Sequence, residues 1–359
     1  MKLSIKTVVL KEMVSRAIKG AGQNKLLPIT SLMAIQLKNH QLTLITTDAS
    51  NTLYVMQDKV DGDDFYCVVQ VDQFSKLISK LTSENTTLTF EDAVLEIKAN
   101  GTYKLELPLD ENGQTISYPD PVAENKIDGE MKEINLTTVK KILTYNKAAL
   151  SSVVDAPEYT GYYCGERVVT TDMYKACGLD VNLFDVDVLL SADTMNLLDV
   201  MTEEKIGVLI RDDMIQFVSN NCVLFAYIMD GIEDYAIDAI NGLLEEEFES
   251  RCKLSKTELL ALLDRIALFV DVNDNKAVTL TFTDKGVDVS STKSNGIETI
   301  EYLDSKNFKP YTCSLDINLF TQQIKAHSSD SIELQYGNDK SVKIVEESIT
   351  QVLAIMQDD

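Results

Sequence analysis

The chain has 359 residues, of which 45% are hydrophobic, and this is enough to build two or three domains with cores of their own. Its 33 Lys and Arg against 57 Asp and Glu give a net charge of −24, which argues against an extended basic surface for nucleic acid. No apolar run is long enough to cross a membrane, and residues 1–11 lack the apolar stretch of a secretion signal. We therefore expect a cytoplasmic protein with no membrane partner.

The first third of the chain predicts a helix and strands, followed by a second helix and three more strands. Apolar residues recur at helical spacing in both helices and alternate with polar residues in the strands. Asp72 stands where the N-cap of the second helix is expected. The expected elements are a helix at 8–20, strands ending at 44–48 and 66–71, a helix at 72–83, and strands at 86–90, 94–99 and 102–107.

The same order of elements recurs twice more, at intervals of roughly 120 residues, the size of one average domain. The middle third predicts a helix at 136–149, strands ending at 168–172 and 187–191, a helix at 192–203, and strands at 206–210, 215–219 and 222–229. The last third predicts a helix at 255–269, strands ending at 287–291 and 311–315, a helix at 316–328 with Asp316 as its N-cap, and strands at 331–336, 341–346 and 350–356.

We therefore expect an α+β fold of three tandem domains, 1–126, 127–246 and 247–359. Each domain is a doubled unit that supplies two helices and two small sheets. The joints between domains are polar: residues 118–129 hold two prolines and several charges, and residues 241–251 hold the run Glu245–Glu246–Glu247.

No pattern typical of a catalytic or metal site stands in the sequence. His40 and His327 are the only histidines, and neither belongs to a Ser/His/Asp or metal-binding pattern. Residues 271–275 resemble the start of a calcium loop, but Lys276 replaces its turn glycine, so we expect an ordinary turn. The six scattered cysteines are expected to be small buried side chains: Cys67, Cys164, Cys177, Cys222, Cys252 and Cys313. We expect no enzyme, no cofactor and no metal.

Five short tracts carry a resemblance to a known family. They lie at 26–29 (Leu-Leu-Pro-Ile), 44–48 (Leu-Ile-Thr-Thr-Asp), 118–120 (Tyr-Pro-Asp), 169–175 (Val-Thr-Thr-Asp-Met-Tyr-Lys) and 229–235 (Met-Asp-Gly-Ile-Glu-Asp-Tyr). Their order and spacing, together with the threefold repeat, resemble the bacterial beta sliding clamp, the beta subunit of DNA polymerase III, along the whole chain.

The resemblance implies a ring-shaped DNA polymerase processivity factor without a catalytic site. Subunits would join head to tail, as a homodimer, with helices lining the hole and sheets outside. The joint would be strand addition between residues 102–107 and 298–304, supported by the helix at 259–269. The ring would encircle double-stranded DNA without reading its sequence, and would tether a replicative polymerase, a clamp loader and other proteins with clamp-binding motifs.

Basic side chains on the helices are the expected DNA contacts, since they would touch phosphates without reading bases. The acidic excess, by contrast, is concentrated in residues 127–246. The predicted DNA-binding residues are Lys11, Arg16, Lys19, Lys25, Lys76, Lys80, Lys140, Lys141, Lys147, Lys256 and Lys325.

The resemblance also implies one hydrophobic pocket that binds peptides of partner proteins. The sequence differs from the family there: Met173–Ala176 replace Gly-His-Arg-Leu, Glu233 replaces a proline, and Asp238 replaces an apolar residue. The predicted wall consists of Tyr159, Thr171, Met173, Tyr174, Lys175, Ala176, Glu233, Asp238, Val352, Ala354 and Met356.

Two other functions are compatible with parts of the sequence. An acidic protein-interaction scaffold of clamp fold that does not encircle DNA would explain the net charge of −24. An unrecognised hydrolase is disfavoured because no nucleophile and base stand in a recognisable pattern. The basic helix faces distinguish the clamp from the scaffold, because only the clamp needs them.

Overall fold

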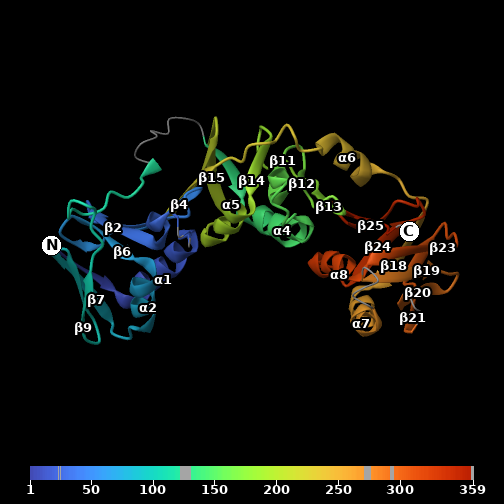
Figure 1. Ribbon diagram of the computed structural model, residues 1–359, viewed down its shortest axis with the longest axis horizontal. Coiled ribbons are helices and arrows are strands. Elements are labelled where there is room, and N and C mark those ends of the chain that lie inside the picture. The colour runs from blue at the N-terminus through green and yellow to red at the C-terminus, as the bar shows by residue number, and fades with distance from the viewer. Residues whose placement is uncertain (23, 25, 122–130, 271–275, 292–294, 357–359) are drawn as a thin grey trace. The chain divides into compact units, whose positions relative to one another are not determined.

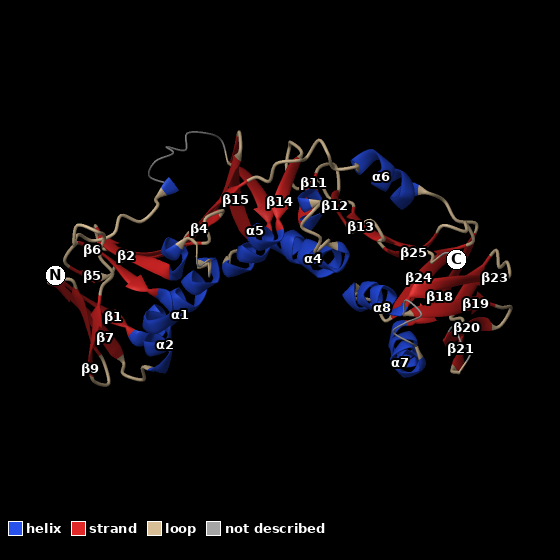
Figure 2. Cartoon of the chain, in the orientation of Figure 1, coloured by secondary structure: helices blue, strands red, loops and turns tan. Residues whose placement is uncertain are grey.

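A computed structural model describes residues 1–22, 24, 26–121, 131–270, 276–291 and 295–356, and Figures 1 and 2 show the helices and strands of each part. Contacts divide the chain into two compact units. Unit 1 comprises Met1–Thr138 and Asp193–Ile228, and unit 2 comprises Val139–Ala192 and Met229–Asp359. Lys25, most of the joint at 118–129 and the turn at 271–275 lie outside the described residues.

Unit 1 contains two antiparallel sheets. The smaller has the order β5-β1-β7-β8-β9, and the larger has the order β10-β15-β16-β17-β4-β3-β2-β6. Alternation sets the faces: β1 buries Leu3 and Ile5 and exposes the residues between them. The smaller sheet consists of β1 (Lys2–Lys6), β5 (Asp61–Gly62), β7 (Asn85–Glu91), β8 (Val94–Lys98) and β9 (Thr102–Glu106). The larger consists of β2 (Leu32–Lys38), β3 (Gln41–Thr47), β4 (Asn51–Gln57), β6 (Phe65–Gln70), β10 (Lys132–Asn135), β15 (Lys205–Arg211), β16 (Met214–Val218) and β17 (Cys222–Tyr227).

The helices of unit 1 cover these sheets with one apolar stripe each. Leu10, Met13 and Val14 are buried on α1, and Phe74 and Ile78 are buried on α2, which lies beside it (Figure 1). The helical segments are α1 (Thr7–Ala17) with the 3-10 turn η1 (Ile18–Gly20), η2 (Pro28–Ser31), α2 (Val71–Lys80), and α5 (Ala192–Leu197) with η5 (Leu198–Val200).

Unit 2 also contains two antiparallel sheets. The larger has the order β14-β11-β12-β13-β26-β25-β24-β18-β22, and the smaller has the order β21-β20-β19-β23. The larger consists of β11 (Gly161–Cys164), β12 (Val168–Thr171), β13 (Lys175–Leu179), β14 (Val188–Ser191), β18 (Ser250–Ser255), β22 (Asp304–Lys306), β24 (Ser331–Tyr336), β25 (Ser341–Glu346) and β26 (Ile349–Ala354). The smaller consists of β19 (Ala277–Phe282), β20 (Gly286–Ser291), β21 (Ile297–Glu301) and β23 (Tyr311–Asp316).

The core of the C-terminal part of unit 2 lies between its two sheets and the neighbouring helices α7 and α8. Leu259, Leu263, Phe320 and Ile324 of these helices pack on strand residues such as Leu280. The helical segments are α4 (Leu136–Asn146), which begins in unit 1 and continues into unit 2, η3 (Lys147–Ala149), η4 (Pro157–Thr160), α6 (Ile237–Glu245), α7 (Lys256–Ile266) with η6 (Ala267–Phe269), and α8 (Ile317–Ala326).

The predicted elements are present, with three corrections. The helix α2 begins at Val71 after Gln70, so Asp72 lies in its first turn and is not its N-cap. The helix predicted at 192–203 ends as a 3-10 turn at Val200. The joint predicted at 241–251 is helical up to Glu245, because α6 continues through it. The prediction for Asp316 is confirmed: its carboxylate accepts hydrogen bonds from the backbone N–H groups of Asn318 and Leu319.

The repeated tracts at 44–48 and 168–172 fold into the same turn in the two units. The Thr46 hydroxyl donates to the carbonyl of Ala17 at 2.6 Å, and the Thr170 hydroxyl donates to the carbonyl of Asn146 at 2.7 Å. Each following threonine, Thr47 or Thr171, donates to the carbonyl four residues on. Two equivalent tracts therefore attach their strands to the ends of equivalent helices, as an internal repeat requires.

His327 lies directly after α8 and is buried. Its Nδ1 is 2.6 Å from Oε2 of Glu346 on β25, and its Nε2 is 2.9 Å from Oε1 of Gln351 on β26. The other Glu346 oxygen accepts hydrogen bonds from the Ser328 and Ser329 hydroxyls at 2.9 and 2.5 Å. Burial opposes ionisation of Glu346, but the hydrogen bonds from the two serines and His327 outweigh it and lower the pKa of Glu346 from 4.5 to about 2.

This carboxylate makes the stability of unit 2 depend on acid. Because its pKa is lowered on folding, its ionised form stabilises the fold above pH 4.5, and this contribution is lost as the pH falls from 4.5 towards about 2. We expect Glu346→Gln to reduce the free energy of unfolding in urea by about 2 to 3 kcal/mol at pH 7, and by less at pH 3.5. Glu347→Gln, at an exposed neighbour, is the control and should have little effect at either pH. An equal loss at both pH values for Glu346→Gln would contradict this account.

Candidate functional site

A cavity of about 180 Å³ opens beside the turn between β12 and β13 in unit 2. Its walls come from that turn, from one face of α6, from the start of β25 and from the end of β26. Most of the side chains are apolar; of the polar ones, Thr171, Lys175 and Ser341 are buried and Lys340 is exposed. The lining residues are Thr171, Met173, Tyr174, Lys175, Ala176, Ala236, Ala239, Ile240, Leu243, Lys340, Ser341, Val352 and Ala354.

Most of the predicted pocket residues line this cavity, and four do not. Tyr159 lies behind it, in a core cluster where its ring centroid is 5.0 Å from that of Tyr235. Glu233 and Asp238 are exposed, and the Met356 backbone N–H donates to the carbonyl of Ser314. Tyr159 therefore supports the cavity wall from the core side. Glu233 and Asp238, the two acidic residues that differ from the family, do not line the cavity.

The sequence-based prediction missed the wall formed by α6. Ala236, Ala239, Ile240 and Leu243 recur at intervals of three and four residues, which is the signal of a helix face. An acidic run follows this face, and such runs are typical of solvated joints, which obscures the signal.

A buried ion pair shapes the turn between the two strands. Asp172 accepts hydrogen bonds from the backbone N–H groups of Tyr174 and Lys175 through Oδ1, at 3.0 and 2.9 Å. Its Oδ2 is 2.6 Å from Nζ of Lys175, whose side chain is only 5% exposed. Met173 takes the left-handed conformation, with φ +74°, at the position where the family has glycine. The turn thus presents the side chains of Met173 and Tyr174 to solvent, 65% and 69% exposed.

The helix α6 is held against the sheet at its C-terminal end. Lys343 of β25 is buried, and its ammonium group donates hydrogen bonds to the carbonyls of Leu244 and Glu246. The ammonium group also lies 5.1 Å from the ring centroid of Phe248. Burial lowers the pKa of Lys343, and the neighbouring carboxylate of Glu246 partly offsets this. A cation at the C-terminus of a helix is favourable, so this contact fixes one wall of the cavity.

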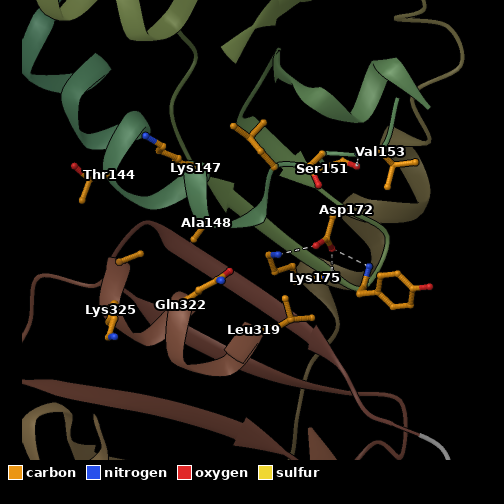
Figure 3. A pocket seen from close by; sticks show the side chains of 14 residues that line it. Thr144, Lys147, Ala148, Ser151, Val153, Asp172, Lys175, Leu319, Gln322 and Lys325 are labelled. Carbon is orange, nitrogen blue, oxygen red and sulfur yellow. Dashed lines mark hydrogen bonds and ion pairs between the residues drawn. The ribbon is translucent and has the colours of Figure 1, made fainter. Parts of the chain in front are cut away.

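A second, larger cavity adjoins the first and shares Tyr174 and Lys175 with it. Its volume is about 780 Å³, and it lies between η3 with the following loop and the exposed face of α8 (Figure 3). Its lining residues are Thr144, Lys147, Ala148, Leu150, Ser151, Ser152, Val153, Asp172, Tyr174, Lys175, Leu319, Gln322, Lys325 and Ala326.

The predicted DNA-binding side chains differ in how they are held. Arg16 donates to the carbonyl of Val200 and to Oδ1 of Asn221, and Lys256 donates to the carbonyl of His327. Lys19, Lys76 and Lys141 form ion pairs with Asp199, Asp72 and Glu347, respectively. Within the described part of the chain no ion pair involves the remaining five: Lys11, Lys80, Lys140, Lys147 and Lys325.

Among the strands that end the described sheets, β9 and β21 lie in the two smaller ones. The strand β9 is the last of the smaller sheet of unit 1, and β21 is the last of the smaller sheet of unit 2. Next to β21, Arg265 of α7 pairs with both carboxylate oxygens of Glu298 at 2.8 and 2.6 Å. Three apolar side chains of η6 and β21 are exposed to solvent: Leu268, Phe269 and Ile297.

Residues 1–114 match the family model described as the DNA polymerase III beta subunit, N-terminal domain. The beta sliding clamp of Staphylococcus aureus is 20% identical to the chain, over 98% of both proteins. The DNA polymerase sliding clamp of Bacillus subtilis superposes with a TM-score of 0.85, at 17% identity and over 100% of both chains. The chain is thus similar to beta sliding clamps along nearly its whole length and has their fold.

A second solved beta clamp gives the same result. The DNA polymerase III beta chain of Streptococcus pneumoniae superposes with a TM-score of 0.86 at 16% identity, over 99% of this chain and all of that one. The predicted α+β beta-clamp fold is confirmed, while the limits of the three domains stay a prediction. No helix in the described part of the chain is long and apolar enough to span a membrane. Among those residues, no group of three or more His, Cys, Asp or Glu side chains is arranged to hold a metal ion.

The Asp172–Lys175 pair predicts an unequal response at the two repeated turns. In Asp172→Asn the amide oxygen still accepts the two backbone N–H groups, but Lys175 loses its counter-charge inside the protein. We expect this substitution to lower the free energy of unfolding of unit 2 by about 3 kcal/mol in urea titrations. The double variant Asp172→Asn/Lys175→Met should recover most of that loss.

Asp48→Asn is the matched control for this prediction. Asp48 accepts the backbone N–H groups of Ser50 and Asn51 in the same turn of unit 1, but its side-chain partner is the neutral amide of Asn51. The control should therefore cost about 1 kcal/mol or less. Equal losses at the two aspartates would mean that the ion pair contributes nothing beyond the turn.

Proposed function

We propose that this chain is a DNA polymerase processivity factor, a ring-forming sliding clamp that encircles double-stranded DNA and has no catalytic site of its own. The observation that carries the proposal is the similarity to beta clamps along 98% of the chain, together with a fold similar to theirs from end to end. A clamp of this kind holds DNA by topology, so its phosphate contacts need only be weak and independent of sequence.

Lysines on the helices, of which Lys11 is half-buried and Lys76, Lys80 and Lys140 are exposed, support a DNA-facing surface in spite of the net charge of −24. Lys11 and Lys80 lie on the neighbouring helices α1 and α2 and have no ion-pair partner within the described residues. Lys140 is exposed on α4. We propose these three, with Lys76, as the main phosphate contacts. Arg16 and Lys256 donate hydrogen bonds to backbone carbonyls within their own units, so we propose that they stabilise the fold and do not contact DNA.

Ring closure is proposed to occur by strand addition between two copies. The strands β9 and β21 each leave one row of backbone donors and acceptors without a strand partner, and such edges pair readily. Pairing β9 of one copy with β21 of the next would be a heterologous contact, which closes a ring when the rotation between copies fits. Leu268, Phe269 and Ile297 would be covered by this contact. A homodimer would contain two such joints.

The two cavities of unit 2 are the proposed site for partner proteins: a replicative polymerase, a clamp loader and other proteins with clamp-binding motifs. The smaller cavity has mostly apolar walls with a few polar groups, as expected of a site that anchors a peptide side chain. Its walls belong to paired strands and to a helix fixed by Lys343, so the site is formed before a partner arrives.

A protein-interaction scaffold of clamp fold remains the alternative function, and the helix lysines discriminate between the two. In the quadruple variant Lys11→Glu, Lys76→Glu, Lys80→Glu and Lys140→Glu, like charges would face the phosphates. We expect the affinity for a duplex of about 30 base pairs, measured by fluorescence anisotropy at low salt, to fall at least tenfold.

The control for this experiment has the same change in net charge. Lys38, Lys59, Lys285 and Lys306 are exposed on strands and turns, away from the helices. Reversing these four should reduce the affinity less than threefold. If both quadruple variants bind the duplex as the unsubstituted chain does, or weaken equally, the helices do not face DNA and the scaffold is favoured.

A further inference from the structure

The two cavities of unit 2 form one groove with two compartments. Tyr174 and Lys175 line both, and Lys175 is paired with Asp172, which lines the larger cavity. The smaller compartment, about 180 Å³, has room for a single anchoring side chain. The larger, about 780 Å³, is within the range of cavities that hold extended ligands. A ligand that fills both must therefore be a chain segment and not a single small group.

The charge of this groove is opposite to that of the protein. The chain carries −24 overall, yet the charged residues that line the groove are four lysines and one aspartate. The aspartate is Asp172, and it is already paired with Lys175. Lys147, Lys325 and Lys340 are exposed and, in the part of the chain that the structure describes, no ion pair joins them to an acidic side chain. Three cations are thus available to a ligand.

The lysines and the apolar surface are arranged along the groove. Figure 3 shows Lys147 and Lys325 on opposite walls at one end of the larger compartment, and Asp172 and Val153 towards the other. Leu319 of α8 lies between these two ends of the compartment. It shares one face of the helix with Gln322 and Lys325. Lys340 stands at the smaller compartment. An extended segment would therefore meet apolar surface in its middle and positive charge towards its ends.

We infer that this groove selects an acidic-apolar peptide segment of a partner protein, with carboxylates held by Lys147 and Lys325 and an apolar side chain inserted in the smaller compartment. The inference rests on the proposed tethering function and names which partners this clamp takes. It moves Lys147 and Lys325 from the predicted DNA contacts to the partner site, because both line a cavity that contains apolar side chains.

The expected difference in affinity between acidic and neutral segments is modest because Lys147 and Lys325 are exposed. Ion pairs between exposed side chains contribute modestly, so two such pairs give an affinity difference of about five- to tenfold at low salt, which is lost at high salt. The apolar anchor supplies most of the affinity, and the lysines supply the selection between acidic and neutral segments.

The test uses the full chain and two matched pools of fluorescent ten-residue peptides. Both pools have Leu and Phe at two fixed central positions; three flanking positions hold Asp in one pool and Asn in the other. Dissociation constants are measured by anisotropy at about 50 mM and about 500 mM salt. We expect the Asp pool to bind about five- to tenfold more tightly at low salt and equally at high salt.

Three variants locate the effect. The double variant Lys147→Gln/Lys325→Gln should remove the preference for the Asp pool and leave the affinity of the Asn pool unchanged. Ala239→Phe, which fills the smaller compartment from an exposed position on α6, should weaken both pools at least tenfold. Lys285→Gln/Lys306→Gln has the same charge change away from the groove and should alter neither.

Four results would overturn the inference: equal affinity of the two pools, no binding of either pool, equal weakening of both pools in Lys147→Gln/Lys325→Gln, or a loss of duplex affinity in that variant with the peptide preference intact. The last result would return the two lysines to DNA. None of the four results tests whether the chain encircles DNA. That proposal is contradicted by a different result, namely that the protein does not remain on a duplex with blocked ends.

Discussion

The architecture depends on antiparallel pairing between strands from distant parts of the chain. In unit 1, β17 pairs with β4, so that Cys222 stands opposite Val55. In unit 2, β13 pairs with β26, so that Ala176 stands opposite Val352. Each pairing covers two strand edges that would otherwise be exposed, and joins two small sheets into one large sheet. Among the described strands, β9 and β21 are two of the sheet edges that have a neighbour on one side only. The proposed ring would repeat between copies what the chain already does within itself.

The proposed partner site is a consequence of the second of these junctions. Lys175 and Ala176 of β13 lie beside Leu353 and Val352 of β26, and the turn before β13 closes the smaller cavity at one end. The ion pair with Asp172 fixes that turn, and Lys343 on the next strand fixes α6 over the cavity. The groove therefore owes its shape to the same hydrogen bonds that hold the sheet together, while its charge comes from side chains that the fold does not need.

Local periodicity was sufficient to predict most helices and strands, because the residues that define them are neighbours in sequence. The helix α6 was missed because an acidic run follows its apolar face, and such runs are typical of solvated joints. The hydrogen bonds of Arg16 to Val200 and Asn221 could not be predicted, since they join positions 184 and 205 residues apart. The pocket was found by resemblance, and only packing distinguishes Thr171, which lines it, from Tyr159, which supports it.

The central claim is that a closed ring of this chain holds duplex DNA by topology and not by affinity. The most direct test is to let the protein thread onto a linear duplex, block both ends with bound streptavidin, and measure what remains after a high-salt wash, with and without restriction cleavage of the duplex. We predict retention on the uncut, blocked duplex and release after a single cut. Equal retention on cut and uncut DNA, or no retention on the blocked duplex, would contradict the account.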